Sequence, residues 1–223
     1  MWITNLRRKF FRPALLLAFL SINALAVKAQ TDLVRAINGL QLRYNRVTSL
    51  SADFSQAHND GGHSQKRESG HLLLKRPGMM KWNYTSPEEK LFISDGKYLY
   101  EYVKVDKYAT RSSILDSEDL RAPFAFLLGK GSLRDEFRRI EFSNESPIKD
   151  GNKVLRLIPR HLQDFDELLI EFDPANYEMS RLSVLKSGGE RSDFLFSNLK
   201  ENVSAPSSEF VFVAPPGVEL RDN

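Results

Sequence analysis

Hydrophobic and polar residues alternate along most of this chain, which is the pattern of β-strands that bury one face. In the segment 79–84, Met80, Trp82 and Tyr84 would share one face, while the charged and amide side chains between them would lie on the other. Similar short runs follow, and turn residues such as Pro77-Gly78 separate most of them. The strands predicted in this way are 69–75, 79–84, 90–94, 97–103, 106–110, 137–143, 153–159, 166–173, 177–186, 190–199 and 209–213. The chain is therefore predicted to be mainly β, with antiparallel strands in an up-and-down sandwich or barrel.

Two segments have the period of a helix. Residues 31–47 carry an apolar residue at every third or fourth position, and an alternating strand with Phe54 on its apolar face follows them. The second helix is predicted over 117–129, where Pro123 would kink or restart it and Gly129 would cap it. The residues expected on its common face are Leu120, Phe124, Leu127 and Leu128.

The N-terminal segment has the composition of a secretion signal. Four basic residues precede an apolar stretch over 14–26, and small residues flank Lys28 in Val27-Lys28-Ala29. Cleavage is expected before Gln30, with cleavage after Ala26 as the alternative, and the apolar run is short for a transmembrane helix. A twin-arginine signal stays open as a second export route. The expected organisation is a signal peptide over 1–29 and one domain over 30–223.

Removing that segment changes the charge balance. Residues 1–29 hold five of the 32 Lys and Arg and none of the 29 Asp and Glu, so the formal charge falls from +3 to −2. An acidic mature chain argues against a nucleic-acid partner. The chain has no cysteine, which excludes disulfides and an N-terminal lipid-modified cysteine.

Candidate catalytic and metal-binding residues lack the partners that such chemistry requires. His58 and His63 flank a polar, glycine-containing turn with no third ligand at a suitable spacing, and His71 and His161 are isolated. The acidic residues Asp164, Asp166 and Glu167 are interpreted as a solvated entry to a strand. The sequence contains neither a Gly-x-Ser-x-Gly motif nor a phosphate-binding loop. We therefore expect no enzyme activity, no metal and no cofactor.

Several short motifs occur in a fixed order along the mature chain. They are Ser49-Leu50-Ser51-Ala52-Asp53-Phe54-Ser55-Gln56, then Gly70 to Pro77 with Trp82 after it, then Ser94-Asp95-Gly96-Lys97, Pro123-Phe124, and Phe210 to Val218. In this order the chain resembles the LolA-type periplasmic carriers, which move lipoproteins to the bacterial outer membrane. The resemblance implies an incomplete antiparallel β-barrel, or half-barrel, whose opening is covered by short α-helices.

The resemblance also implies a role for individual residues. Arg76 corresponds to the arginine that hydrogen-bonds the lid helices and holds the empty cavity closed. The alternative from the sequence alone is an arginine that extends along the surface at a strand end. The residues expected to line the acyl-chain cavity are Phe54, Met80, Trp82, Tyr84, Leu120, Phe124, Leu127 and Leu128.

The partners follow from the same resemblance. They are acylated lipoproteins as cargo, an inner-membrane ABC-type lipoprotein release complex, and an outer-membrane acceptor lipoprotein. The protein is expected to act as a monomer in the periplasm of a Gram-negative bacterium. The alternative function is a lipid-binding or sensor module of the cell envelope that uses the same half-barrel without shuttling.

Overall fold

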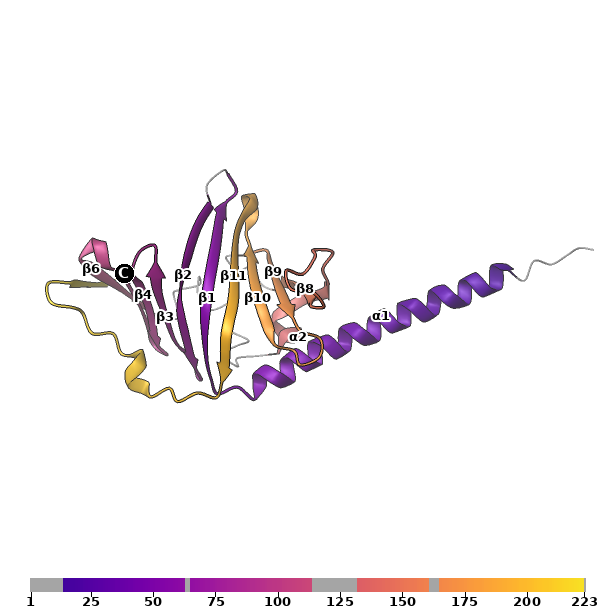
Figure 1. Ribbon diagram of the computed structural model, residues 1–223, viewed down its shortest axis with the longest axis horizontal. Coiled ribbons are helices and arrows are strands. Elements are labelled where there is room, and N and C mark those ends of the chain that lie inside the picture. Colours follow the sequence, from indigo (N-terminus) through magenta and orange to yellow (C-terminus); the bar gives the residue numbers. More distant parts are fainter. Residues whose placement is uncertain (1–13, 63–64, 114–131, 161–164, 223) are drawn as a thin grey trace, which may run out of the picture.

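The structure is a computed structural model that describes residues 14–62, 65–113, 132–160 and 165–222 (Figure 1). It contains one large sheet and a long N-terminal helix, α1 (Ala14–Asn45). The strands are β1 (Ser49–Asp60), β2 (Gln65–Lys75), β3 (Met79–Ser86), β4 (Lys90–Asp95), β5 (Tyr98–Val103), β6 (Tyr108–Ser113), β7 (Phe137–Phe142), β8 (Lys153–Pro159), β9 (Glu167–Phe172), β10 (Met179–Leu185), β11 (Glu190–Glu201) and β12 (Glu219–Asp222). The short helices are α2 (Leu133–Glu136), η1 (Lys104–Asp106), η2 (Ser187–Gly189) and η3 (Ser207–Phe210).

The sheet is open. Within the described residues its 12 strands follow the order β12-β6-β5-β4-β3-β2-β1-β11-β10-β9-β8-β7, so that β12 and β7 stand at opposite ends. Neighbouring strands are antiparallel except β12, which runs parallel to β6. Two meanders, β1–β6 and β7–β11, are joined where β1 pairs with β11. The predicted mainly β half-barrel is confirmed. The predicted lid helix over 117–129 lies outside the described residues.

The alternation in the sequence places side chains on the predicted faces. Met80, Trp82 and Tyr84 of β3 are buried on the face that packs against α1, which we call the inner face. Register continues this face into the neighbouring strands, where Leu72 lies opposite Trp82 and Phe54 opposite Gly70. The core is therefore made of one face of the sheet and the C-terminal half of α1.

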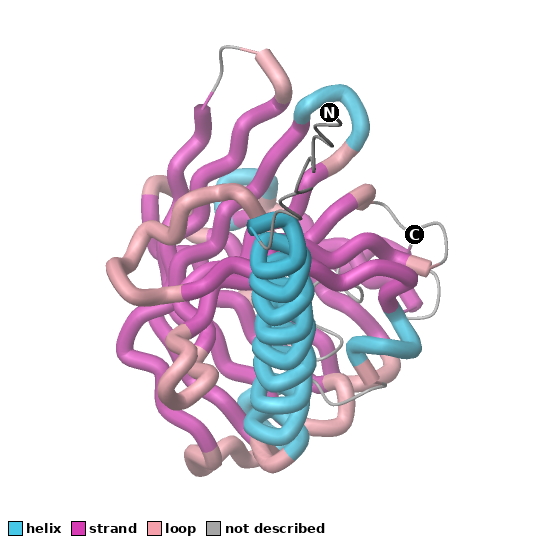
Figure 2. The backbone as a smooth tube through the Cα atoms, turned by 90° about the vertical axis from the view of Figure 1, so that its right-hand side faces the viewer, coloured by secondary structure: helices cyan, strands magenta, loops and turns pink. Residues whose placement is uncertain are grey.

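The helix α1 packs with one end only. Ile37, Leu40 and Tyr44 are buried against the sheet, and the opposite end of the helix projects away from the sheet (Figures 1 and 2). The helix runs without interruption through the expected cleavage position before Gln30. No helix within the described part of the chain is both long and apolar enough to cross a membrane.

The C-terminal part corrects one prediction and adds one strand. The predicted strand 209–213 is wrong: η3 occupies its first part, and the residues after it pair with no strand. This segment instead crosses the outer face of the sheet, where Phe210 is buried and the ring of Phe212 stacks on Tyr100 with centroids 5.4 Å apart. The strand β12 was not predicted, because its four residues are all exposed and show no alternation.

The first turn is also shorter than predicted. β1 extends to Asp60, and His58 lies opposite Lys66 of β2, with its ring nitrogen Nδ1 2.8 Å from the Ser192 hydroxyl of β11. The polar side chains of residues 58–60 were interpreted as part of the turn, because a strand that is polar on both faces shows no alternation. Gly61 follows β1 directly, and its φ of 82° favours glycine.

Gly70 marks a close approach between strands. The register of β2 and β3 shifts between Ser69 and Gly70, which is the geometry of a β-bulge. A Cβ atom at Gly70 would lie 2.0 Å from the carbonyl oxygen of Asn83. Only glycine therefore fits where the rings of Phe54 and Tyr84 meet, with centroids 4.8 Å apart.

Replacing Gly70 by alanine should lower the free energy of unfolding by roughly 1–3 kcal/mol, since the backbone of β3 must move to accept the methyl group. Denaturation in urea measures this change. The matched control is Gly62→Ala, because a Cβ atom there meets only the flexible Asp60 side chain, at 3.2 Å. Equal unfolding midpoints for the two variants would show that β3 does not constrain position 70.

Candidate functional site

Aromatic side chains form a continuous floor on the inner face of β1, β3 and β11. Phe54 meets Trp82 edge to face, with ring centroids 4.9 Å apart, and Trp82 meets Phe194 in the same way at 5.6 Å. Tyr84 extends the floor to Phe92 of β4, at 5.6 Å. Edge-to-face contacts fix the orientation of the rings as well as burying them. The structure thus brings four of the predicted cavity residues together, Phe54, Met80, Trp82 and Tyr84, all nearly fully buried.

The other four predicted cavity residues cannot be placed in this way. Leu120, Phe124, Leu127 and Leu128 lie outside the described residues. The assignment of all eight residues to an acyl-chain cavity stays a prediction.

A row of polar groups limits the aromatic floor at one end. The Tyr84 hydroxyl donates a hydrogen bond of 2.8 Å to Gln56, and Lys90 lies over the Tyr84 ring at 5.0 Å. Lys90 forms an ion pair with the buried Glu68. Burial raises the pKa of the Glu68 carboxyl, but bonds from Lys90 and Lys66 outweigh it and leave that pKa below its ordinary value. Burial raises the pKa of the Tyr84 phenol. The Glu68 carboxyl therefore stays charged and the Tyr84 phenol stays neutral, so the floor ends at a fixed polar border.

Arg76 lies at the opposite end, in the turn between β2 and β3. Its guanidinium donates one hydrogen bond to the Asn45 carbonyl, at 2.9 Å, and another to the Tyr44 carbonyl. These carbonyls belong to the last turn of α1, where helix carbonyls lack intrahelical partners. A cation there is also favoured by the helix dipole. Burial lowers the pKa of the Arg76 guanidinium. Arg76 therefore makes carbonyl contacts of the expected kind, and within the described residues the helix that accepts them is α1.

The same turn of α1 is bonded to the other half of the sheet. The Tyr44 hydroxyl accepts a hydrogen bond of 2.9 Å from the backbone N–H of Met179 in β10. Burial raises the pKa of Tyr44 to about 12. Arg43 forms ion pairs with Glu201 at 2.6 Å and with Glu178 at 3.2 Å. Arg43, Tyr44 and Arg76 thus connect β2–β3 to β10–β11 through one helix turn.

On the outer face, buried charges hold the segment between β7 and β8 against the sheet. The carboxylate of Glu171, which is 1% exposed, accepts bonds from the backbone N–H groups of Ile148 and Lys149 and from Arg181. Glu145 pairs with Arg181 at 2.5 Å and with Arg191 at 2.9 Å. Because each buried charge has a partner, this segment has a defined position.

The family is identified by comparison with known proteins. The family model described as "Outer membrane lipoprotein carrier protein LolA" matches residues 45–213. This chain belongs to the LolA family. An outer-membrane lipoprotein carrier protein from Bordetella avium is 32% identical over 208 residues, which cover 89% of this chain and 95% of the relative. A protein of the same name from Aeromonas salmonicida is 31% identical over 192 residues, which cover 84% and 89% of the two chains.

Solved structures show the fold of the LolA family chain. An uncharacterised conserved protein from Thermus thermophilus aligns with a TM-score of 0.51 and 13% identity, over 88% of this chain and 99% of the other. At this identity the likeness concerns the fold alone. The family names describe carriers and not enzymes, which agrees with the expectation from the sequence.

Sequence analysis missed Arg43 and Tyr44. The residue Tyr44 carried a helix-period signal, so it was assigned to the apolar face of a helix and its hydroxyl was not considered. The partners of both residues lie more than 100 positions away in the chain, at Met179, Glu178 and Glu201. His71 was interpreted as an isolated residue, but its ring nitrogen Nδ1 lies 2.5 Å from the Asp53 carboxylate on the outer face.

The ion pairs of Glu145 predict a pH dependence of stability. Hydrogen bonds from Arg191 hold its pKa at about 2, against the opposing effect of burial. A carboxyl whose folded pKa lies below its unfolded value stabilises the fold above the unfolded value, and this contribution is lost as the pH falls. Glu145→Gln should therefore be less stable than the parent by roughly 2–3 kcal/mol at neutral pH.

The difference should shrink as the pH falls from about 4.5 to about 2, the window between the two pKa values. Thermal unfolding at a series of pH values measures it. The control Glu89→Gln removes a carboxylate from an exposed pair with Lys104 and should leave the unfolding curve unchanged. A Glu145→Gln difference that is independent of pH would contradict the role assigned to its charge.

Proposed function

We propose that this chain is a periplasmic carrier that binds the acyl chains of lipoproteins leaving the inner membrane and delivers them to an outer-membrane acceptor. Residues 1–29 serve as its cleavable signal peptide. The observation that carries the proposal is the buried aromatic floor of Phe54, Trp82 and Tyr84 on the inner face of an open sheet, in a chain of the LolA family. An open sheet can separate from what covers it and so admit a ligand to that face.

The physical need for such a carrier follows from the cost of exposing acyl chains to water. Burial of each methylene is worth about 0.8 kcal/mol, so several long chains amount to tens of kcal/mol. Protein affinities saturate near about −20 kcal/mol, and a carrier cannot extract such cargo from a membrane unaided. An inner-membrane ABC-type release complex would supply the energy, and an acceptor lipoprotein with higher affinity would receive the cargo.

In this proposal Arg76 stabilises the closed, empty state. Its bonds to the carbonyls of Tyr44 and Asn45 hold α1 to the β2–β3 turn. Closing energy opposes cargo binding, because a ligand that needs the open state binds in proportion to the population of that state. A carrier whose closed state is strongly favoured therefore releases its cargo readily.

Trp82 should report the entry of cargo. Removal of residues 1–29 leaves it as the single tryptophan, since the chain has only two and the other is Trp2. The fluorescence emission should change when an acylated lipopeptide is added to the processed protein, and the same peptide without acyl chains should have no effect. Trp82→Phe is the control for the origin of the signal. Demonstrated binding of the lipopeptide without any change in emission would show that Trp82 is core and not cavity wall.

Arg76→Leu should hold cargo more tightly and release it poorly. The lost charged hydrogen bonds are worth about 1.5–3 kcal/mol, which corresponds to roughly 10- to 100-fold in affinity. Transfer of bound lipopeptide to acceptor-bearing vesicles measures release, and Arg76→Lys should be intermediate because lysine lacks the planar fork.

The matched control for this prediction is Arg46→Leu, because Arg46 lies near the same helix end with an exposed side chain. It should transfer cargo at the rate of the parent protein. Release from Arg76→Leu as fast as from Arg46→Leu would leave Arg76 as an ordinary arginine at a strand end.

A further inference from the structure

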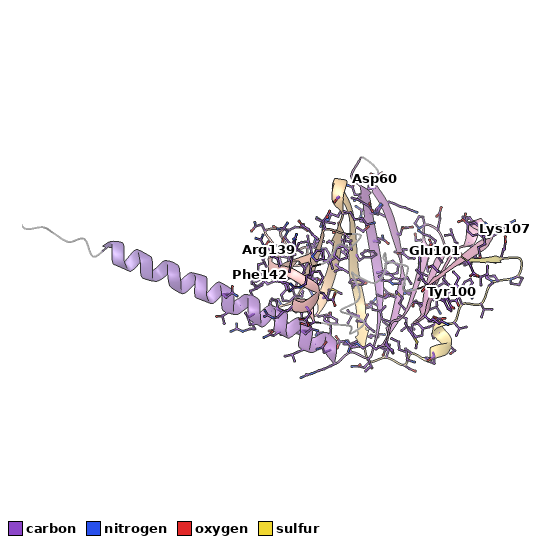
Figure 3. All side chains as sticks on the ribbon, turned by 180° about the vertical axis from the view of Figure 1, so that it is seen from behind. Asp60, Tyr100, Glu101, Lys107, Arg139 and Phe142 are labelled. Atoms are coloured by element: carbon purple, nitrogen blue, oxygen red, sulfur yellow. The ribbon has the colours of Figure 1, made fainter. Side chains whose placement is uncertain are left out.

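A groove of about 630 Å³ lies between α1 and the end of the sheet formed by β7, β8 and β9. This volume is in the range of sites that bind one small molecule. Its apolar wall includes Phe142, Val154 and Phe172, and Ala36 closes it from α1. Figure 3 shows Phe142 on β7, on the side of the body from which α1 projects.

One wall of the groove is fixed by Tyr177. The residue has a φ of 63°, a conformation that non-glycine residues rarely adopt, and its ring stacks on Phe172 with centroids 6.2 Å apart. The ring also lies directly against Gly39 of α1, where an added Cβ atom would be 2.2 Å from it. The turn holds this position through a bond of 2.7 Å from the Tyr177 N–H to the Asp173 carbonyl. The Tyr177 ring therefore fixes the distance between α1 and the sheet at this point.

The opposite wall is the segment between β7 and β8. The buried carboxylate of Glu171 binds its backbone at Ile148 and Lys149, and Glu145 is held by Arg181 and Arg191. Asn152, which is itself a lining residue, donates a bond of 3.1 Å to Glu171. Both walls are thus anchored independently of any ligand, so the groove is formed in advance.

Charge is distributed unevenly around the rim. The Asp32 and Arg35 side chains neutralise each other at 3.1 Å, and Glu145 is neutralised by its two arginines. Lys153 is exposed, and among the described residues its side chain has no hydrogen bond or ion pair. The groove therefore combines an apolar interior with one uncompensated ammonium group at its edge.

We propose that this groove binds a single acyl chain, with the oxygen-bearing end of the chain at Lys153. Phe142 and Phe172 belong to the same inner face as the aromatic floor, so a chain in the groove adjoins that face. The proposal deepens the carrier function and rests on it, because one chain of the cargo is the natural occupant. A free fatty acid of the envelope offers the same chemistry, and the test separates the two sources.

The test maps the site by photo-crosslinking in the protein purified from the envelope of a Gram-negative host. One arm uses palmitic acid with a diazirine on its chain, and the other uses a lipopeptide with the same group on one acyl chain. Labelled peptides are identified by mass spectrometry. We expect labels in the segments 142–154 and 172–177, in addition to any on β1 and β3.

Each outcome decides a different point. Groove labelling by the lipopeptide, by palmitic acid or by both supports the site and identifies the source of the chain. Labels confined to β1, β3 and β11 overturn the groove while leaving the carrier function intact. Absence of any label from either probe overturns the groove and the carrier function together.

A charge reversal at the rim gives a second readout. Lys153→Glu should lower groove labelling by palmitic acid about tenfold, since a charged bond is lost and a like charge is added. Labelling of β1 and β3 should stay as in the parent protein, which shows that the variant is folded. The matched control is Lys107→Glu, because Lys107 is an exposed lysine at the end of η1 that does not line the groove, and the change should alter labelling by less than about twofold. Equal labelling of the two variants would overturn the role of Lys153.

Discussion

The fold depends on the last turn of α1, because an open sheet cannot fix its own curvature. A closed barrel sets its radius by the ladder that joins its last strand to its first, and here β7 and β12 stand at opposite ends of the strand order. Tyr44 replaces that seam: its carbonyl accepts a bond from Arg76 at the β2–β3 turn, and its hydroxyl accepts one from Met179 in β10. The two meanders are thus held at a fixed distance across the joint between β1 and β11. One helix turn thus takes the place of a hydrogen-bonded strand ladder, and its few bonds are broken more easily than those of a ladder.

The two faces of the sheet are covered in different ways. The inner face carries the aromatic floor, which ends at the Tyr84–Gln56 hydrogen bond and at the ion pairs of Glu68 with Lys66 and Lys90. The outer face is covered by the segment between β7 and β8 on one side and by the C-terminal segment on the other, where Lys81 pairs with Glu209 at 2.8 Å. Rigid coverage outside leaves the inner face as the side on which packing can change. The outer ion pairs therefore stabilise the sheet on the side away from the apolar floor.

The sequence allowed prediction of whatever depends on local periodicity. The faces of β3, the buried side of α1 and most strand positions follow from steps of two and of three to four. Contacts between distant segments could not be predicted in this way, since nothing near Tyr44 or Arg43 in the chain indicates Met179 or Glu201 as partners. The prediction of a strand over 209–213 was wrong for a related reason. Its side chains do alternate, with Phe210 buried and Val211 exposed, but the segment packs on a face of the sheet and pairs with no strand. The resemblance to a family supplied the candidate site, and it could not supply the groove beside α1.

The aromatic floor and the groove both adjoin α1, so the two proposed sites depend on the position of one helix. Ala36 closes the groove, and Tyr44, two turns further along the same helix, binds both halves of the sheet. Any movement of α1 that breaks the Arg76 bonds also displaces the helix that walls the groove. Gly39 lies between these points and is pressed against the Tyr177 ring, so the helix cannot slide there without moving the β9–β10 turn. Binding in the groove and opening of the inner face would therefore be coupled through the position of one rigid helix. Under the proposed function, re-formation of the Arg76 bonds would act on the floor and on the groove together, because both sites depend on the position of α1.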